Sequence, residues 1–300
     1  MTGISFNLSG KLDSSLTQAL CDVKLAADSL DIPFFVIGAT ARDIVLEHCH
    51  AIRSPRATRD LDIAVEVAGW NEFKKLTEAL IVSGGFSATG QLHKLRSATY
   101  ELDIVPFGPI SQDKRSIRWP PDNSVIMNIM GFHEAFSHAH LIRIADDPPM
   151  DVHVPTIPGI VILKLISWHD NYPLRAKDAE DLRFFIEHYA EAGNELRLFD
   201  EEPGLMREED FDLTLASIRL LGRDMASMSS EAMITEILTI LERETGEQKH
   251  YHLVQDMIAG AKAFGKFDET LAKVEKMKKG FTEYALAENR TNKSPKMALE

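Results

Sequence analysis

Apolar positions in the first half of the chain alternate between helical and strand-like spacing. Residues 12–30 carry apolar side chains at helical spacing, and PFFVIG at 33–38 predicts a short buried strand that ends in glycine. TARDIVLEHC at 40–49 returns to helical periodicity, and the run from Leu61 to Val67 predicts a second buried strand. This alternation predicts an α/β domain, with a mixed sheet and flanking helices.

The same alternation continues as far as residue 157. GWNEFKKLTEALIVSGG at 69–85 predicts an amphipathic helix that Gly84 and Gly85 end. HKLRSAT at 93–99 and YELDIVPFG at 100–108 predict a hairpin, and HLIRIAD and MDVHVPTI predict two later strands.

Beyond Pro158 the apolar spacing is helical almost throughout. The expected helices cover residues 159–170, 175–190, 209–226, 229–244, 250–263 and 267–288. We therefore predict an α/β domain over 1–157, an all-α C-terminal domain over 158–288 and a disordered tail over 289–300.

Composition is that of an ordinary soluble globular protein, with 44% hydrophobic and 26% charged residues. The longest apolar runs are too short for a membrane span, and the first residues do not have the pattern of a signal peptide. Cys21 and Cys49 form no CxxC pair and favour a reducing, cytoplasmic location. The HCH stretch at 48–50 indicates a helix end rather than a metal site.

The net charge of −13 argues against a broad surface for non-specific nucleic-acid binding. Basic residues nevertheless gather locally, and such clusters suit a nucleoside triphosphate or one RNA end. The residues concerned are Arg53, Arg56, Arg59, Lys114, Arg115 and Arg118.

Two aspartates interrupt the buried strand that ends at Val67. Asp60 and Asp62 are two residues apart, so their side chains leave an extended chain on the same face. In one interpretation Asp60 caps the strand and Asp62 pairs with Arg59 or another base. In the other, Asp103 of a neighbouring strand joins them, and three carboxylates at one sheet edge hold two Mg²⁺ (or Mn²⁺) ions.

The VIGATARD stretch places a glycine turn before these aspartates. Gly38 allows close backbone approach, and the free amides of the next helical turn favour a phosphate. The order of glycine turn, DxD strand and third acidic strand resembles the DNA polymerase β-like nucleotidyltransferase superfamily. The positions that match are Gly38, Ala39, Asp60, Asp62 and Asp103.

The chain is most similar to the AbiEii-type nucleotidyltransferases, which include toxin components of toxin–antitoxin pairs. GATAR matches the G-G-T-A-x-R pattern of that group, with Ala39 in place of glycine. The resemblance implies nucleotide binding by Gly38, Ala39, Thr40 and Arg42, and metal binding by the three aspartates. Arg42 and Asp43 could also simply pair at the helix start.

A second hallmark of that group resembles PGIVILKLISWHDNYPLRAKDAEDLRFFI. It implies that the helical domain completes the active site, with Lys164 on the triphosphate and Asp178 orienting that lysine or activating the acceptor. Alternatively, Lys164 is a snorkelling surface lysine, and Asp178 and Asp181 pair with Arg175 and Lys177 on an exposed helix face. The role of Asp181 is left open.

The resemblance implies transfer of a nucleoside monophosphate from an NTP to an acceptor hydroxyl. The acceptor would be a tRNA 3′ end, a protein or a small molecule, and a cognate antitoxin is a further expected partner. One alternative is the tRNA-maturing or poly(A)-polymerase branch, whose opening resembles VIGATARDIVL, although the segment after DIVPFG has no R-R-D-F-type block. The other is a nucleotide- or partner-binding protein that has lost catalysis, favoured by Ala39 and disfavoured by the three carboxylates.

Overall fold

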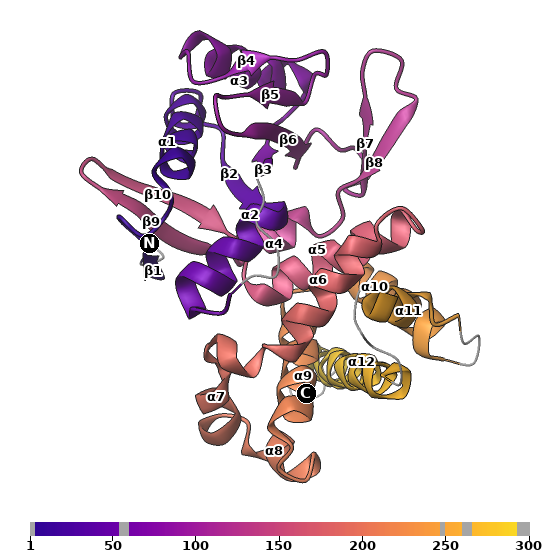
Figure 1. Cartoon of the computed structure of the whole chain (residues 1–300). Helices are drawn as coiled ribbons and strands as arrows, with labels where there is room; N and C mark the ends of the chain where they lie inside the picture. Colours follow the sequence, from indigo (N-terminus) through magenta and orange to yellow (C-terminus); the bar gives the residue numbers. More distant parts are fainter. Residues whose placement is uncertain (1–3, 54–59, 247–249, 260–265, 293–300) are drawn as a thin grey trace, which may run out of the picture. The chain divides into compact units, whose positions relative to one another are not determined.

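The computed structural model describes residues 4–53, 60–246, 250–259 and 266–292 (Figure 1). The chain divides into two compact units, Met1–Ile160 and Val161–Glu300. The division falls inside one helix, α5 (Ile157–Asp170), a few residues after the boundary predicted from the sequence.

The first unit is built on an eight-stranded mixed sheet with the order β1-β9-β10-β2-β3-β6-β5-β4. Its strands are β1 (Phe6–Asn7), β2 (Phe34–Ile37), β3 (Asp60–Glu66), β4 (Ser87–Ala88), β5 (Lys94–Arg96), β6 (Glu101–Phe107), β9 (His140–Asp146) and β10 (Pro149–Val154). The predicted hairpin and the two predicted late strands are confirmed as β5–β6 and β9–β10.

The centre of this sheet is buried on both faces, as its apolar sequence requires. All four residues of β2 are buried, and β3 is buried from Ile63 to Val65. β3 pairs antiparallel with β2 and parallel with β6, and β5 pairs antiparallel with β6. The residues that start β3 and β6 therefore lie at the same edge as the residues that end β2.

Helices flank the sheet, and a separate two-stranded sheet completes the unit. The helices are α1 (Ser14–Asp28), α2 (Gly38–Asp43), the π-helix η1 (Ile44–Cys49), α3 (Trp70–Val82) and α4 (Phe132–Ser137). The small sheet pairs β7 (Ser116–Trp119) with β8 (Val125–Asn128), in a segment where the sequence analysis predicted no strand. The HCH stretch ends η1, as predicted.

The second unit is helical. After α5 come α6 (Ala176–Glu187), the π-helix η2 (Ala190–Asn194), α7 (Glu195–Asp200), α8 (Pro203–Glu208), α9 (Leu213–Ser227), α10 (Glu231–Thr245), α11 (His252–Ala259) and α12 (Phe267–Asn292). The short helices α7 and α8 were not predicted. The predicted tail lies outside the described residues from 293 on, and α12 reaches Asn292.

Close packing of α9 on α12 depends on two glycines. A Cβ at Gly222 would lie 2.1 Å from the Met277 carbonyl oxygen, and one at Gly280 would lie 1.9 Å from the Arg219 carbonyl oxygen. Because both obstacles are backbone atoms, neither can move aside cheaply. The fold class predicted from the sequence, an α/β domain followed by a helical domain, is confirmed. No helix among the described residues is long and apolar enough to cross a membrane.

Candidate active site

The predicted carboxylates come together on neighbouring parallel strands of the first unit. Asp60 lies opposite Glu101, and Asp62 lies opposite Asp103. Leu61 and Leu102, the residues between them, are fully buried and leave the opposite face of the sheet. Each strand thus places an acid–leucine–acid sequence at the same level, so four carboxylates share one face and one edge.

The predicted glycine turn lies directly against this edge. Ile37, the last residue of β2, is opposite Asp62. Gly38 has φ +67°, and a Cβ on it would come within 2.1 Å of Asp62 Oδ2. Only glycine combines that backbone conformation with such an approach. The start of α2 is therefore held against the Asp62 carboxylate.

The other predicted nucleotide-binding residues make contacts within the unit. Thr40 is buried, and its Oγ1 donates a hydrogen bond to the Asp60 carbonyl oxygen at 2.8 Å, which fixes α2 to β3. Arg42 is also buried, and its Nε donates to Asp43 Oδ1 at 2.8 Å. Ala39 is half-buried. Nucleotide binding by these residues stays a prediction.

Lys94 is a charged neighbour of the carboxylates that the sequence analysis missed. It lies opposite Asp103 on β5, and its Nζ is 3.0 Å from Asp103 Oδ2. The hydrogen bond with Asp103 raises the pKa of Lys94, and the charges of Glu101 and Asp60 add to this shift. The second oxygen, Asp103 Oδ1, is buried without a hydrogen-bond partner within the described part of the chain.

A pocket of about 460 Å³ adjoins these residues, lined by Thr89, Gly90, Gln91, Lys94, Arg96 and Glu101. Arg96 Nη2 is 2.6 Å from Glu101 Oε1, and this contact lowers the pKa of the Glu101 carboxyl. A sequence signal for Glu101 did exist, because ELD repeats the acid–leucine–acid pattern of DLD. Lys94 could be assigned only once the register of β5 against β6 was known.

In the second unit, Lys164 is buried and forms ion pairs with Asp178 and Asp181. Its Nζ donates to Asp178 Oδ1 at 3.0 Å and to Asp181 Oδ2 at 2.7 Å. Ser167 Oγ donates to Asp178 Oδ2 at 3.0 Å, and Arg175 approaches the same oxygen at 4.0 Å. Asp181, whose role the sequence left open, thus shares the contact with Asp178, and both carboxylates are buried rather than exposed.

The donor set on β3 and β6 fits a hard divalent cation. Its ligands would be the carboxylate oxygens of Asp60, Asp62 and Asp103, and Mg²⁺ and Mn²⁺ prefer oxygen. Asp103 Oδ1, which has no hydrogen-bond partner among the described residues, is a buried acceptor that such an ion would satisfy. The competing interpretation, a pair between Asp62 and Arg59, involves an arginine that lies outside the described residues.

Comparison with known protein families identifies the class of protein. A family model described as "Nucleotidyl transferase AbiEii toxin, Type IV TA system" matches residues 18–272, which include every candidate site residue. The protein is therefore a nucleotidyltransferase. More particularly, the chain belongs to the AbiEii family, as the glycine turn and the lysine-containing hallmark led us to expect.

Solved structures resemble the chain at low sequence identity. The antibiotic-resistance factor ANT(2'')-Ia is 16% identical, and the match covers 66% of this chain and 98% of that one, with a TM-score of 0.37. An antigenic nucleotidyltransferase-like protein from Paracoccidioides brasiliensis is 18% identical over 68% and 93% of the two chains, with a TM-score of 0.40. The Thermotoga maritima CCA-adding enzyme in complex with tRNA is 14% identical over 95% and 85%, with a TM-score of 0.25. A search of curated proteins found no match.

Proposed function

We propose that the protein transfers a nucleoside monophosphate from an NTP to an acceptor hydroxyl, with Asp60, Asp62 and Asp103 holding two Mg²⁺ or Mn²⁺ ions. The observation that carries the proposal is the register of β3 on β6. This register sets Asp62 opposite Asp103, and one buried Asp103 oxygen has no hydrogen bond among the described residues. The pairing of β2 with β3 brings Gly38 to the same carboxylate.

In the transfer, a bond forms between the acceptor oxygen and the α-phosphorus, and the bond to pyrophosphate breaks. Divalent ions would supply charge neutralisation on the triphosphate and a lower pKa for the acceptor hydroxyl. Gly38 removes the side chain that would otherwise keep a phosphate away from the backbone beside Asp62. Lys94 balances part of the carboxylate charge when no nucleotide is bound.

Lys164 and Asp178 belong to the same proposal. Lys164 would bind the triphosphate and neutralise the departing pyrophosphate, and Asp178 would orient the lysine through the 3.0 Å contact between them. Both residues lie in the family match. The proposed partners are an acceptor on tRNA, on a protein or on a small molecule, and a cognate antitoxin.

Calorimetric titration with each NTP, in Mg²⁺ and in excess chelator, tests the role of the carboxylates. We expect NTP binding to weaken at least about tenfold without metal, because no divalent ion then offsets the repulsion between the triphosphate and the carboxylates. Asp103→Asn should lose most of this metal dependence. Asp28→Asn, which alters an exposed carboxylate on α1, should retain it. Equally tight NTP binding with and without Mg²⁺ would show that the proposed metal site is wrong.

Incubation of the enzyme with each radiolabelled NTP and with total tRNA, total protein or the enzyme alone identifies the acceptor. Label in one fraction names the acceptor class. Incorporation of C and A restricted to tRNA without its 3′ end would favour the tRNA-maturing alternative. Tight metal-dependent NTP binding without transfer, in the presence of a whole-cell extract, would favour the binding protein that has lost catalysis.

A further inference from the structure

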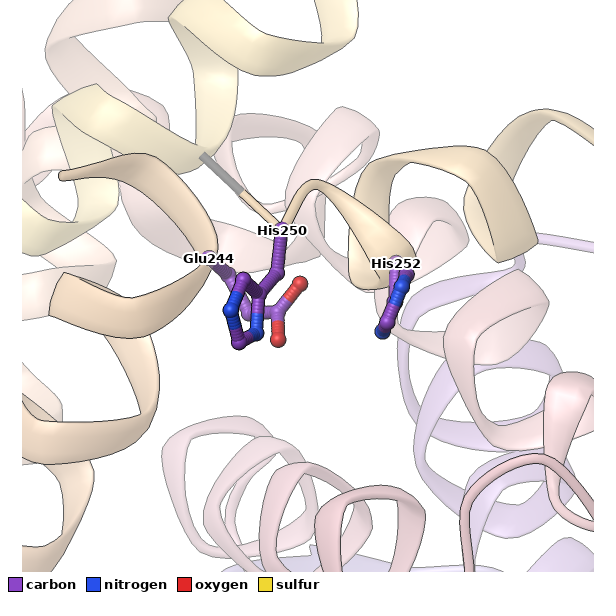
Figure 2. A group of neighbouring side chains, drawn as sticks. All are labelled: Glu244, His250 and His252. Carbon is purple, nitrogen blue, oxygen red and sulfur yellow. The ribbon is translucent and has the colours of Figure 1, made fainter. Parts of the chain in front are cut away.

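A second group of metal-ligating side chains lies entirely within the helical unit, where α10 ends and α11 begins. Glu244 is in the last turn of α10, His250 precedes α11, and His252 is its first residue. One ligand atom from each of the three side chains lies within 4.8 Å of the other two. Figure 2 shows the His250 ring beside the Glu244 carboxylate, with the His252 ring facing the same space.

Glu244 is held as a ligating carboxylate commonly is, by hydrogen bonds to both of its oxygens. The residue is fully buried. Its Oε1 accepts a hydrogen bond from Arg243 Nε at 3.1 Å, and its Oε2 accepts one from the Leu253 amide at 3.0 Å. Each carboxylate oxygen can accept two hydrogen bonds, so each of these oxygens retains a lone pair for an ion.

The two histidines differ in how firmly they are held. The His252 ring stacks on Tyr172, with centroids 4.6 Å apart and planes inclined by 1°. His250 is exposed, and its ring centroid lies 5.6 Å from that of His252. The His252 imidazole and the Glu244 carboxylate are thus two ligands held in place by their neighbours, and the exposed His250 supplies the third.

Neighbouring charges set limits on what can bind. Besides Glu244, Arg243 also contacts His169, whose Nδ1 lies 2.8 Å from Arg243 Nη2. Burial, chiefly, and the Arg243 charge lower the pKa of His169. Asp256, one helical turn after His252, accepts a hydrogen bond from Trp168 Nε1 at 2.8 Å. A metal ion here would meet the Arg243 cation as well as the Glu244 carboxylate, so the site favours an ion that bonds strongly to the imidazole nitrogens.

We propose that Glu244, His250 and His252 bind one divalent transition-metal ion of the Zn²⁺ class, with water in the fourth position on the exposed side. Two imidazole nitrogens and one carboxylate are a donor set that suits Zn²⁺ and Co²⁺, whereas Mg²⁺ prefers oxygen ligands alone. The ion would join the end of α10 to the start of α11. This site is separate from the carboxylates of β3 and β6, and it does not depend on the proposed transfer reaction.

The test is calorimetric titration of the full chain, purified without a histidine tag, with Zn²⁺ and then Co²⁺ in the presence of excess Mg²⁺. We expect one equivalent of each ion to bind, a rise in the thermal midpoint with Zn²⁺, and visible absorption from tetrahedral Co²⁺. Affinity should fall as the solution is acidified, because metal ligation requires neutral imidazoles.

Variants assign the ligands. His250→Ala and His252→Ala should each weaken Zn²⁺ binding at least about tenfold, and the exposed His250 can be changed without loss of packing. Glu244→Gln keeps an acceptor for the Leu253 amide and should weaken Zn²⁺ binding similarly. His133→Ala, which removes an exposed histidine on α4, is the matched control and should bind as wild type does. The proposal is overturned if the wild-type chain binds no Zn²⁺, or if the His250→Ala/His252→Ala double variant binds it equally well.

Discussion

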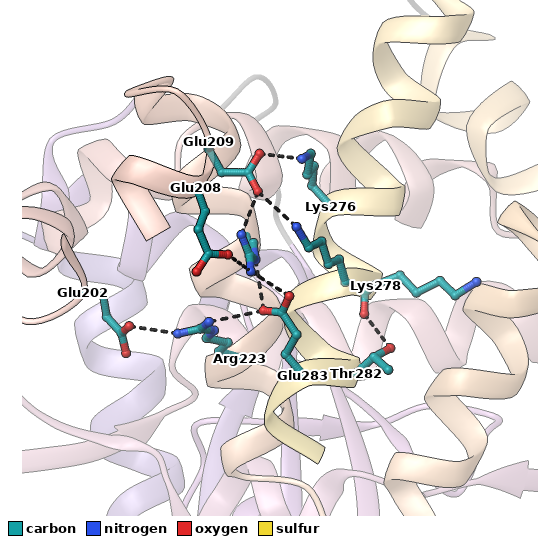
Figure 3. A network of polar contacts seen from close by, with 10 residues as sticks. Glu202, Glu208, Glu209, Arg223, Lys276, Lys278, Thr282 and Glu283 are labelled. Atoms are coloured by element: carbon teal, nitrogen blue, oxygen red, sulfur yellow. Dashed lines mark hydrogen bonds and ion pairs between the residues drawn. The ribbon is translucent and has the colours of Figure 1, made fainter. Parts of the chain in front are cut away.

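The two units each contain a dense group of charged side chains. In the first unit most of these side chains are carboxylates, whereas in the second unit cations and anions are paired. On the sheet edge of the first unit, Asp60, Asp62, Glu101 and Asp103 lie on adjacent strands, with Lys94 on the strand beside them. In the second unit, Arg219 on α9 joins glutamates from α8, from α12 and from the residue after α8, in a network where cations and anions alternate (Figure 3).

Arg219 has its three side-chain nitrogens all engaged. Its Nε donates to Glu283 at 3.0 Å, its Nη1 to Glu209 at 2.9 Å and its Nη2 to Glu208 at 2.5 Å. Glu209 in turn accepts from Lys276, and Arg223 links Glu283 to Glu202. The Arg219 side chain is only 3% exposed, so such complete pairing is what its burial requires.

The contrast separates charges that support the fold from carboxylates that we propose to hold a ligand. In the network around Arg219 the buried charges are paired, whereas at the sheet edge Asp103 Oδ1 is a buried acceptor without a hydrogen bond among the described residues. Buried groups of this kind are found at functional sites because a ligand can satisfy them. Lys164 with Asp178 and Asp181 is intermediate, because one buried cation is shared by two buried carboxylates and Arg175 lies 4.0 Å from Asp178.

The largest expected effect is that of Asp62→Asn on catalysis. Removing one carboxylate relieves repulsion in the metal-free protein but takes away a proposed metal ligand, so transfer should fall on the order of 10³-fold. The thermal midpoint without metal should stay the same or rise. Label transfer and calorimetry on one preparation give both values. A lower midpoint with transfer retained would show instead that Asp62 stabilises the fold and holds no metal ion.

Arg219→Met, in contrast, is expected to lower the stability of the fold. Three glutamates would lose their shared cation, and Glu209 is buried, so unfolding by urea should show a loss of about 3–5 kcal/mol. Arg207→Met, on the exposed surface of α8, should change stability by less than about 0.5 kcal/mol. If Arg219→Met were as stable as the control, the network would be an arrangement without energetic consequence.

Variants of Lys164 decide to which side of the comparison this lysine belongs. Lys164→Met removes the buried cation that two buried carboxylates share and should cost about 3 kcal/mol. Adding Asp181→Asn removes one of those charges and should restore most of the stability. If Lys164 acts on the triphosphate, transfer stays low in the stable double variant. Recovered transfer would mean that the lysine only supports the fold.

Sequence patterns predicted the parts of this structure that depend on short segments. The buried strands, the glycine turn and the DLD and ELD sequences could all be recognised locally, and the register of β3 on β6 then places Asp62 opposite Asp103. Partners far apart in the chain were harder to predict. The contact of Lys164 with Asp178 was expected only from the family resemblance, and the share of Asp181 in it was left open. Lys94 reaches Asp103 through the pairing of β5 with β6, which no local pattern indicates. The two-stranded sheet of β7 and β8 was not predicted, because Pro120 and Pro121 between the two strands indicate a loop.

The smallest expected effect is a difference between the units in mild acid. In the first unit burial lowers the pKa of four histidines below the ordinary value of 6.5, namely His50, His93, His140 and His153. In the second unit, among the described residues, His169 alone shows such a lowered pKa. As the pH falls, these histidines bind protons in the unfolded chain before they do so in the folded chain. The free energy of unfolding is therefore unaffected by them above pH 6.5 and decreases as the pH falls through and below that value.

Hydrogen exchange at pH 7 and pH 5.5 should therefore show more loss of protection in β9 and β10 than in α9 and α12. His140→Phe removes one of these groups and keeps a ring beside Phe6, so it should reduce the loss in β9. Equal loss of protection in both units would mean that the buried histidines do not control the acid response.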